Sequence, residues 1–486
     1  MPGRITIVGL GPGSPLSIPP EAMEAIDAAA VVFLRTTEHP AARAIAARRS
    51  CETFDSAYDA SESFEDVYRT IVDRVVEAGR TAPGVVYAVP GDPMVGEATT
   101  GAVVGEARAR GIPVQILHAA SFLEPCLELV GLDALEGLQV ADGSEIARRH
   151  FPPLSPDRPA LLAQVYSRLV ASDLKLTLLH QYPPDHGVVV VNDAGTPDAR
   201  IESVALEDLD RDERFSHATA VYLPPRPASS AFETLQDTIA HLRAPDGCPW
   251  DREQTHTSLR PHMLEEAYET LEAIDQASPL SLREELGDLL LQIVLQAQIA
   301  AEAGDFTMAD VVAGIQEKLV RRHPHVFGDV VVEDVGQVLH NWEHLKAGER
   351  EQAGEGRGVL DGVPHALPAL AQAFEIQSRA ARLGFDWRTL EGVRSKMEEE
   401  WGEVEGAGDE ATRAAEVGDL LFAVVNYARW LKVDAEAALQ GANRRFRDRF
   451  AEMEAAAGLA NQSMGDMTLE ELEALWQHAK AKERRR

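Results

Sequence analysis

The feature of this 486-residue sequence that most constrains its fold is a repeat within the second half of the chain. Three motifs occur twice, in the same order and at similar spacing: EEAYE (265–269) and EEWGE (399–403), EELGDLLLQIV (284–294) and AEVGDLLFAVV (415–425), and NWEHLK (341–346) and LWQHAK (475–480). Chance similarity between helices would hardly give an ordered series of three matches. The second half therefore contains two copies of one unit.

Both copies have the pattern of helices that carry acidic groups on one face. Leucines such as Leu286, Leu289 and Leu290 recur at the i, i+3, i+4 spacing of a buried helical stripe. The acids come in i,i+3 pairs, which places both members of a pair on one face. Two such helices packed antiparallel would bring four carboxylates together in each copy: Glu266, Glu269, Glu285 and Asp288 in the first, and Glu400, Glu403, Glu416 and Asp419 in the second.

The acidic pairs have two interpretations. Most helical charge runs are solvated faces, and EEAYE alone is compatible with that interpretation. Asp288 and Asp419, however, lie beside apolar stripes, where a carboxylate needs a partner. Oxygen ligands without imidazole suit hard cations, so the pattern favours an Mg²⁺ (or Mn²⁺) site that recruits a phosphate.

Basic and aromatic residues also recur in both copies. KLVRRHPHVF (318–327) has a counterpart in NRRFRDRF (443–450), and a Trp precedes a Lys by four residues in each third motif. Core packing is the ordinary explanation of a single Trp, but the repeated spacing favours binding of a base and its phosphates. The candidate substrate-binding residues are Lys318, Arg322, Trp342, Lys346, Arg445, Arg449, Trp476 and Lys480.

The net charge restricts the class of partner. A formal charge of −33 and a pI near 4.8 disfavour nucleic acid and anionic membranes as partners. The longest apolar helical pattern, 286–303, is interrupted by polar residues and does not span a bilayer. Three cysteines without metal-type spacing are compatible with a reducing compartment. These features predict a soluble cytoplasmic protein.

The first part of the chain has a different organisation. Strand candidates at 4–9, 29–34, 84–89, 112–117 and 186–192 alternate with helical stretches such as 62–79 and 97–110, which indicates an α/β fold with a largely parallel sheet. LPPRPASS (223–230) and GEREQAGEGRG (348–358) have linker composition. Beyond residue 230 only DVVVED (329–334) is a strand candidate, so this part is predominantly α. We expect a multidomain chain with limits at 1–224, 230–348 and 358–486.

The helical part resembles the MazG family of nucleoside triphosphate pyrophosphohydrolases. Further matching segments are GCPWDREQTH (247–256), KLVRRHPHVFGD (318–329) and RLGFDW (382–387). The resemblance implies an all-α, dimeric fold and Mg²⁺-dependent hydrolysis of NTPs or dNTPs to NMP and pyrophosphate. It implies that the four acids of each copy bind metal and that Glu265 and Glu399 orient the attacking water. Where active members can carry a Lys, this chain has Ser281 and Thr412, with Arg283 and Arg413 nearby.

The segment 1–224 resembles the tetrapyrrole methylase superfamily in its YabN-like form. The resemblance rests on VGLGPGS (8–14), YAVPGDPMVGE (87–97), AASFLE (119–124) and AQVYSRLVASDLKLTLLHQYP (163–183). It implies two α/β lobes with S-adenosylmethionine bound between them. Ser14 stands where methylases commonly have Asp, which counts against tetrapyrrole methylation. The implied cofactor-binding residues are Gly11, Pro12, Gly13, Pro90, Gly91, Asp92 and Ser121.

Three functions remain open at this point. The leading one is NTP pyrophosphohydrolysis that removes surplus or non-canonical nucleotides. The first alternative is an S-adenosylmethionine-dependent methyltransferase whose helical repeats are regulatory. The second is a non-enzymatic scaffold that senses S-adenosylmethionine.

Overall fold

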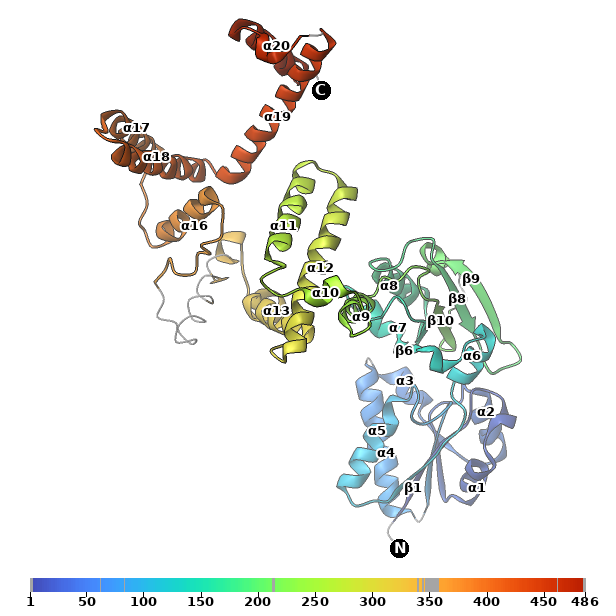
Figure 1. Ribbon diagram of the computed structural model, residues 1–486. Coiled ribbons are helices and arrows are strands. Elements are labelled where there is room, and N and C mark those ends of the chain that lie inside the picture. The colour runs from blue at the N-terminus through green and yellow to red at the C-terminus, as the bar shows by residue number, and fades with distance from the viewer. Residues whose placement is uncertain are drawn as a thin grey trace. The chain divides into compact units, whose positions relative to one another are not determined.

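The computed structural model describes residues 3–338, except 62, 83 and 212–214, then 341, 342 and 345, and finally 358–460 and 462–483. The side chain of Asp59 is also outside the description. Contacts divide the chain into two compact units, Met1–Val312 and Ala313–Arg486. Figure 1 shows the α/β part in blue to green and the helical part in yellow-green to red.

The first lobe is built on a parallel sheet of order β3-β2-β4-β1-β5. Its strands are β1 (Ile5–Gly9), β2 (Val31–Leu34), β3 (Glu52–Thr53), β4 (Val85–Val89) and β5 (Val114–Leu117). Its helices are α1 (Pro20–Ala28), α2 (Pro40–Arg48), α3 (Asp55–Ala60), α4 (Phe64–Thr81) and α5 (Ala98–Ala109), with a 3-10 turn at Pro15–Ser17.

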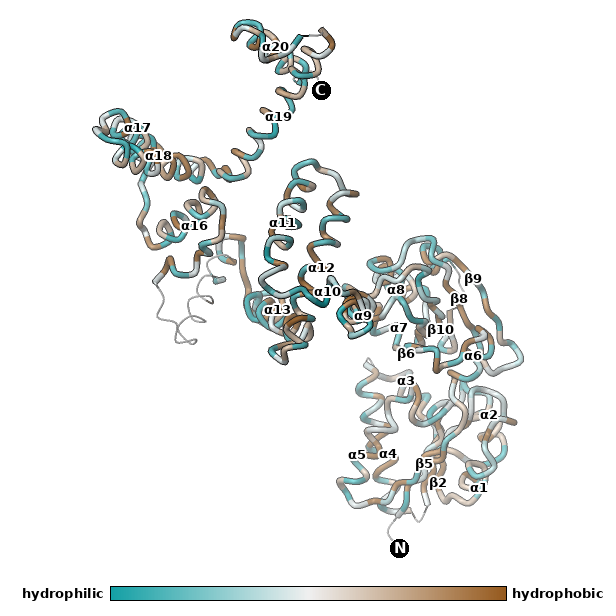
Figure 2. Tube along the Cα trace, in the orientation of Figure 1, coloured by the Kyte–Doolittle hydropathy of each residue, from teal (hydrophilic) through white to brown (hydrophobic). Residues whose placement is uncertain are grey.

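Both faces of this sheet are covered, which explains why its strands are nearly continuous apolar runs. Alternate residues of β1 point to opposite faces: Ile5 and Ile7 pack with α4 and α5, and Val8 packs with α1 and α2. The hydropathy colouring in Figure 2 shows these strands as hydrophobic segments. The expectation of an α/β lobe with a parallel sheet is confirmed here.

The second lobe has a sheet of order β6-β7-β10-β8-β9, and this sheet is mainly antiparallel. Only β6 and β7 pair in parallel. Its strands are β6 (Gln139–Asp142), β7 (Ala160–Ala163), β8 (Gly187–Asn192), β9 (Arg200–Ala205) and β10 (Thr219–Leu223). The helices are α6 (Leu123–Val130), α7 (Gly143–Ala147) and α8 (Arg168–Leu178), with 3-10 turns at Ala134–Glu136 and Leu206–Arg211. A largely parallel arrangement was therefore wrong for this lobe.

The rest of the described chain is helical. The helices of the first unit are α9 (Phe232–Arg243), α10 (Pro249–Glu253), α11 (Arg260–Asp275) and α12 (Pro279–Ala303), and α13 (Met308–Arg322) continues into the second unit. The second unit also contains α14 (Pro324–Phe327), α16 (Ala369–Arg382), α17 (Leu390–Gly406), α18 (Glu410–Trp430), α19 (Ala435–Leu459) and α20 (Leu469–Glu483), with a 3-10 turn at Met464–Asp466. The strand expected at 329–334 is irregular instead. Among the described residues no helix is both long and apolar enough to cross a membrane.

The first two repeated motifs form two helical hairpins, α11–α12 and α17–α18, whereas the second occurrence of the third motif (475–480) lies on α20. Short connections join the helices of each hairpin, and a side chain caps each second helix. Ser278 accepts a hydrogen bond from the backbone N–H of Ser281, and Asp409 accepts one from that of Thr412. Ser281 and Thr412, which occupy the position of an expected Lys, thus take part in the start of their helices.

Candidate active sites

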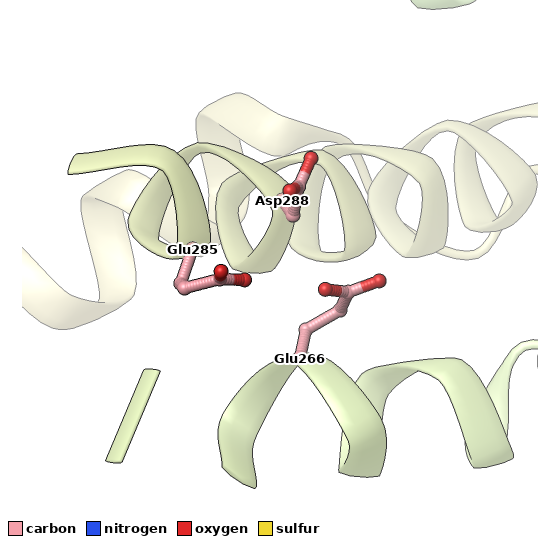
Figure 3. Close-up of side chains that lie close together, drawn as sticks. All are labelled: Glu266, Glu285 and Asp288. Carbon is pink, nitrogen blue, oxygen red and sulfur yellow. The ribbon is translucent and has the colours of Figure 1, made fainter. Parts of the chain in front are cut away.

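The first hairpin brings three carboxylates together. Glu266 on α11 points toward α12, which carries Glu285 and Asp288 (Figure 3). One carboxylate oxygen from each residue lies within 4.8 Å of those of the other two. Thr270 joins the two helices at this level, because its hydroxyl donates to the carbonyl of Glu266 (2.8 Å) and approaches that of Glu285 (3.4 Å).

The second hairpin repeats the arrangement with Glu400, Glu416 and Asp419, again within 4.8 Å of one another. Glu400 is buried, with 6% of its surface exposed. An ammonium group accompanies this cluster, because Lys396 Nζ lies 2.7 Å from Glu400 Oε1 and 2.9 Å from Glu399 Oε1. We call these two sets of three acids the first and second triads.

Burial and electrostatic repulsion within the first triad shift the pKa values of Glu266 and Glu285. Burial, followed by the charges of Asp288 and Glu269, raises the pKa of Glu266. Burial and the same two neighbours raise the pKa of Glu285. Such mutual repulsion disfavours the charged form, and a bound cation would reverse it. The donor set, all carboxylate oxygen, fits a hard divalent ion.

The fourth acid of each copy lies beside its triad and not within it. Glu269 acts electrostatically on Glu266 and Glu285. Burial, followed by the charges of Glu400 and Glu416, raises the pKa of Glu403. Both fourth acids are therefore close enough to interact electrostatically with the triads.

The two acids that precede the triads have different partners. In the first copy, Glu265 Oε2 lies 3.7 Å from His262 Nδ1. In the second copy, Glu399 pairs with Lys396. Hydrogen bonding to Glu400 and Glu399 raises the pKa of Lys396, so its ammonium group remains charged. Sequence reasoning missed Lys396, although its position four residues before Glu400 on a helix could have identified it.

The basic and aromatic candidates make contacts with one another. The guanidinium carbon of Arg322 lies 5.9 Å from the Trp342 ring centroid, and that of Arg449 lies 5.4 Å from the Trp476 ring centroid. Arg449 also pairs with Glu483 at 2.7 Å. Lys318 on α13 is exposed, as is Arg445 on α19, and Lys480 is half-buried on α20. Lys346 lies outside the described residues.

The glycine-rich turns of the first lobe meet at the carboxyl ends of β1 and β4. Gly11 and Gly91 exchange backbone hydrogen bonds (3.3 and 2.9 Å), and both have positive φ. A Cβ atom on Gly13 would lie only 2.7 Å from Thr196 Cγ2 in the second lobe. Pro12 similarly packs beside Gly195 of that lobe. This edge of a parallel sheet is where α/β folds bind ligands.

Asp92 is held firmly at the same edge, directly after Pro90 and Gly91. Its carboxylate accepts hydrogen bonds from Met94 N (2.8 Å) and Ala119 N (3.2 Å), and it pairs with His118 Nδ1 (2.8 Å). Burial opposes ionisation, but these hydrogen bonds lower the pKa of Asp92 overall.

Ser121 is buried nearby, on the turn that follows β5. Its hydroxyl donates to Glu124 at 2.7 Å. The candidate cofactor residues therefore gather on three neighbouring turns of one lobe, whereas the sequence did not identify His118 as the partner of Asp92.

Comparison with known proteins matches two families. The tetrapyrrole (corrin/porphyrin) methylases match residues 4–210, and the MazG nucleotide pyrophosphohydrolase domain matches residues 254–327. An uncharacterized protein, YabN of Bacillus subtilis, is 40% identical over 499 residues that span both chains completely.

Two relatives match the helical part alone. The nucleoside triphosphate pyrophosphohydrolase/pyrophosphatase MazG of Thermotoga maritima is 44% identical over 253 residues, which are 52% of this chain and 97% of the relative. The nucleoside triphosphate pyrophosphohydrolase of Escherichia coli K12 is 46% identical over 257 residues, with the same coverage. The chain therefore belongs to the MazG family of enzymes, in the YabN-like form that carries an N-terminal tetrapyrrole methylase domain.

Proposed function

We propose that this protein hydrolyses nucleoside triphosphates, NTP or dNTP, to the monophosphate and pyrophosphate at the two triads. The observation that carries the proposal is the recurrence of three carboxylates, each set within 4.8 Å, at matched positions of two hairpins. The relatives named as nucleoside triphosphate pyrophosphohydrolases cover this half of the chain. The biological role would be removal of surplus or non-canonical nucleotides in the cytoplasm.

The triads and the fourth acids, Glu269 and Glu403, would hold Mg²⁺ or Mn²⁺. When bound, such an ion supplies a Lewis acid for the reacting phosphate and neutralises the leaving pyrophosphate. Glu265 and Glu399 would accept a hydrogen bond from the attacking water and orient its lone pair toward the α-phosphorus. As the water's oxygen forms the new bond to that phosphorus, the bond from the phosphorus to the bridging oxygen would break, pyrophosphate would leave, and the water's proton would pass to the carboxylate.

The basic residues would neutralise the remaining phosphate charge. A protein of charge −33 repels a nucleoside triphosphate at long range, so local cations are needed. Lys396 is held beside the second triad by Glu399 and Glu400. The exposed Lys318 and the guanidinium of Arg322 would serve the first copy, and Arg445, Arg449 and Lys480 the second.

The decisive experiment is pyrophosphate release from a panel of NTPs and dNTPs, with Mg²⁺ and then with EDTA. We expect the chelator to abolish release, and Asp288→Asn combined with Asp419→Asn to do the same. Glu284→Gln is the matched control, because it removes one acid next to Glu285 without touching either triad. Pyrophosphate release that survives in the double variant would refute the assignment of the triads.

We also propose that the protein assembles as a dimer through its helical half. Large apolar side chains of both hairpins are half exposed, among them Leu271 (50%), Ile274 (53%), Leu286 (49%) and Leu421 (52%). Exposed apolar groups in this density mark interaction surfaces. Sedimentation equilibrium should give twice the chain mass, and Leu271→Asp with Leu421→Asp should shift it toward the monomer. A purely monomeric wild type would contradict the dimer.

A second candidate function rests on the N-terminal lobes. The paired turns at Gly11 and Gly91 and the hydrogen-bonded Asp92 would place S-adenosylmethionine at the carboxyl ends of β1 and β4. The domain would then transfer a methyl group or sense the cofactor. Titration calorimetry with S-adenosylmethionine tests binding. No heat at millimolar ligand, in a protein whose pyrophosphohydrolase activity is intact, would argue against this role. We retain 1–224, 230–348 and 358–486 as proposed domain limits.

A further inference from the structure

A tryptophan and a histidine form an open aromatic pair next to the first triad. Trp250 on α10 and His262 on α11 have ring centroids 6.4 Å apart and planes at 66°. Trp250 is 56% exposed, and the His262 side chain is 45% exposed. An exposed indole beside an imidazole offers a flat apolar surface with hydrogen-bonding edges.

Side-chain hydrogen bonds fix the short helix α10, which carries Trp250, to its neighbours. The Arg243 side chain is only 6% exposed and pairs with Glu302 at 2.8 Å. Its guanidinium also donates to the carbonyls of Asp251 and Gln254, on either side of the end of α10. Arg252 donates to the carbonyl of Pro245 at 2.9 Å. These bonds fix the backbone at Trp250, so the indole is exposed on an ordered element.

A continuous path leads from this pair to the triad. His262 Nδ1 lies 3.7 Å from Glu265, which adjoins Glu266 of the first triad. Since a helix rises 1.5 Å per residue, His262 and Glu266 are about 6 Å apart along α11. The Trp250 ring centroid lies a further 6.4 Å from that of His262. The separation between the indole and Glu266 is thus of the kind that separates the base of a nucleotide from its phosphates.

The second copy is built differently at the same place. Alignment of EEAYE with EEWGE sets Lys396 opposite His262, and alignment of the GCPW and GFDW motifs sets Trp387 opposite Trp250. Trp387 packs against Gly392, where an added Cβ atom would lie 2.8 Å from the indole. Lys396 directs its ammonium group to Glu399 and Glu400. The pairing of an exposed indole with an imidazole is therefore a property of the first copy, whereas the second copy exposes Trp401 (61%), whose Nε1 donates to Glu405 at 3.2 Å.

We propose that Trp250 and His262, in place of Trp342, whose ring lies against the guanidinium of Arg322, form the nucleobase subsite of the first copy. The base stacks on the indole, the imidazole edge borders it, and the phosphates lie toward Glu266. The inference rests on the proposed nucleotide chemistry and assigns it a base-recognition surface. Every base has a π face, so stacking on Trp250 binds purines and pyrimidines alike and discriminates weakly between them.

The test uses full-length protein in which the second triad is disabled by Glu400→Gln and Asp419→Asn. Calorimetry with Mg²⁺ measures the binding of α,β-methylene analogues of four NTPs, which resist cleavage at that bond, and of inorganic tripolyphosphate. Trp250→Ala should weaken analogue binding about 10- to 100-fold and leave tripolyphosphate binding unchanged. Trp250→Phe, which keeps an aromatic face, should retain most of the affinity.

Each contrary outcome has a distinct meaning. Equal analogue affinity in Trp250→Ala and its parent overturns the subsite, as does an equal loss of tripolyphosphate binding. A changed sedimentation coefficient with unchanged analogue affinity would also overturn it, since Trp250 would then contact a second copy of the chain. If the parent binds neither analogue nor tripolyphosphate, the proposed nucleotide chemistry of this copy fails as well.

Discussion

His39 gives the N-terminal lobes a defined response to acid. It lies before α2, close to the backbone of Gly11 and to His217 of the second lobe. Burial, reinforced by the charge of His217, lowers its pKa from 6.5 to about 4. His39 is therefore neutral in the folded protein at pH 7, and its neutral form is the one that the fold accommodates.

The difference between the pKa of His39 in the unfolded chain (6.5) and in the folded chain (about 4) sets the sign and size of its effect on the free energy of unfolding. Between pH 4 and pH 6.5 the unfolded chain binds a proton at this position and the folded chain does not, so the stabilisation declines as the pH falls through that window. A difference of about 2.5 pKa units corresponds to about 3 kcal/mol. His39→Gln, which cannot ionise, should abolish this part of the pH dependence.

The measurement must report on the N-terminal lobes alone. All six tryptophans lie at or beyond residue 250, so intrinsic tryptophan fluorescence follows only the helical half. Urea unfolding at pH 7 and pH 4.5, followed by pulsed hydrogen exchange of peptides from β1, reports on the sheet itself. Because pH 4.5 lies above the folded-state pKa of about 4, the wild type should lose about 2 kcal/mol more than His39→Gln between these two pH values.

A control removes a histidine without changing the buried site. His150 is exposed, so His150→Gln should keep the pH dependence of the wild type. An identical decrease in the free energy of unfolding for wild type and His39→Gln would refute the reasoning.

Three further predictions concern single side chains. Tyr87→Phe removes the buried hydrogen bond to Thr99 (2.8 Å) and should reduce the stability of the first lobe by about 1–2 kcal/mol in the same exchange assay. Lys396→Gln makes the second triad more negative and should tighten its Mn²⁺ binding several-fold by calorimetry, whereas Arg394→Gln, on the same helix, should not. Gly11→Ala forces a Cβ atom onto a residue with φ of +75° and within 2.7 Å of a neighbouring hydroxyl. It should cost about 1–3 kcal/mol and weaken S-adenosylmethionine binding by calorimetry.

Local patterns in the sequence predicted the hairpins and all three acids of each triad, together with a fourth acid that lies beside it. The i,i+3 spacing of Glu285 and Asp288 fixes both on one face of α12, and the short connection to α11 makes an antiparallel neighbour the simplest arrangement. The longer strands of the first sheet were also predicted from local patterns, because a strand such as Val85–Val89 presents apolar side chains to both faces of the sheet.

Features that depend on distant residues were not predictable. The sequence did not predict strands β6 and β9 of the second sheet. β9 is mostly exposed and β6 has only four residues, so neither has a strong apolar pattern. The contact between Asp92 and His118 joins residues that are 26 positions apart in the sequence, so no local pattern indicates it. Helical spacing places Glu269 and Glu403 on the acidic faces, but it does not determine which carboxylate oxygens come within 4.8 Å of one another.

Each triad is contained in one short, continuous stretch of chain, 266–288 in the first copy and 400–419 in the second. Such a site needs no distant segment to complete its acid set, so it can form early in folding through local contacts. Because all three acids lie in one hairpin, duplication of the hairpin or its transfer to another protein carries the complete triad. Each copy can then change its surroundings independently, as the exchange of histidine for lysine at positions 262 and 396 illustrates.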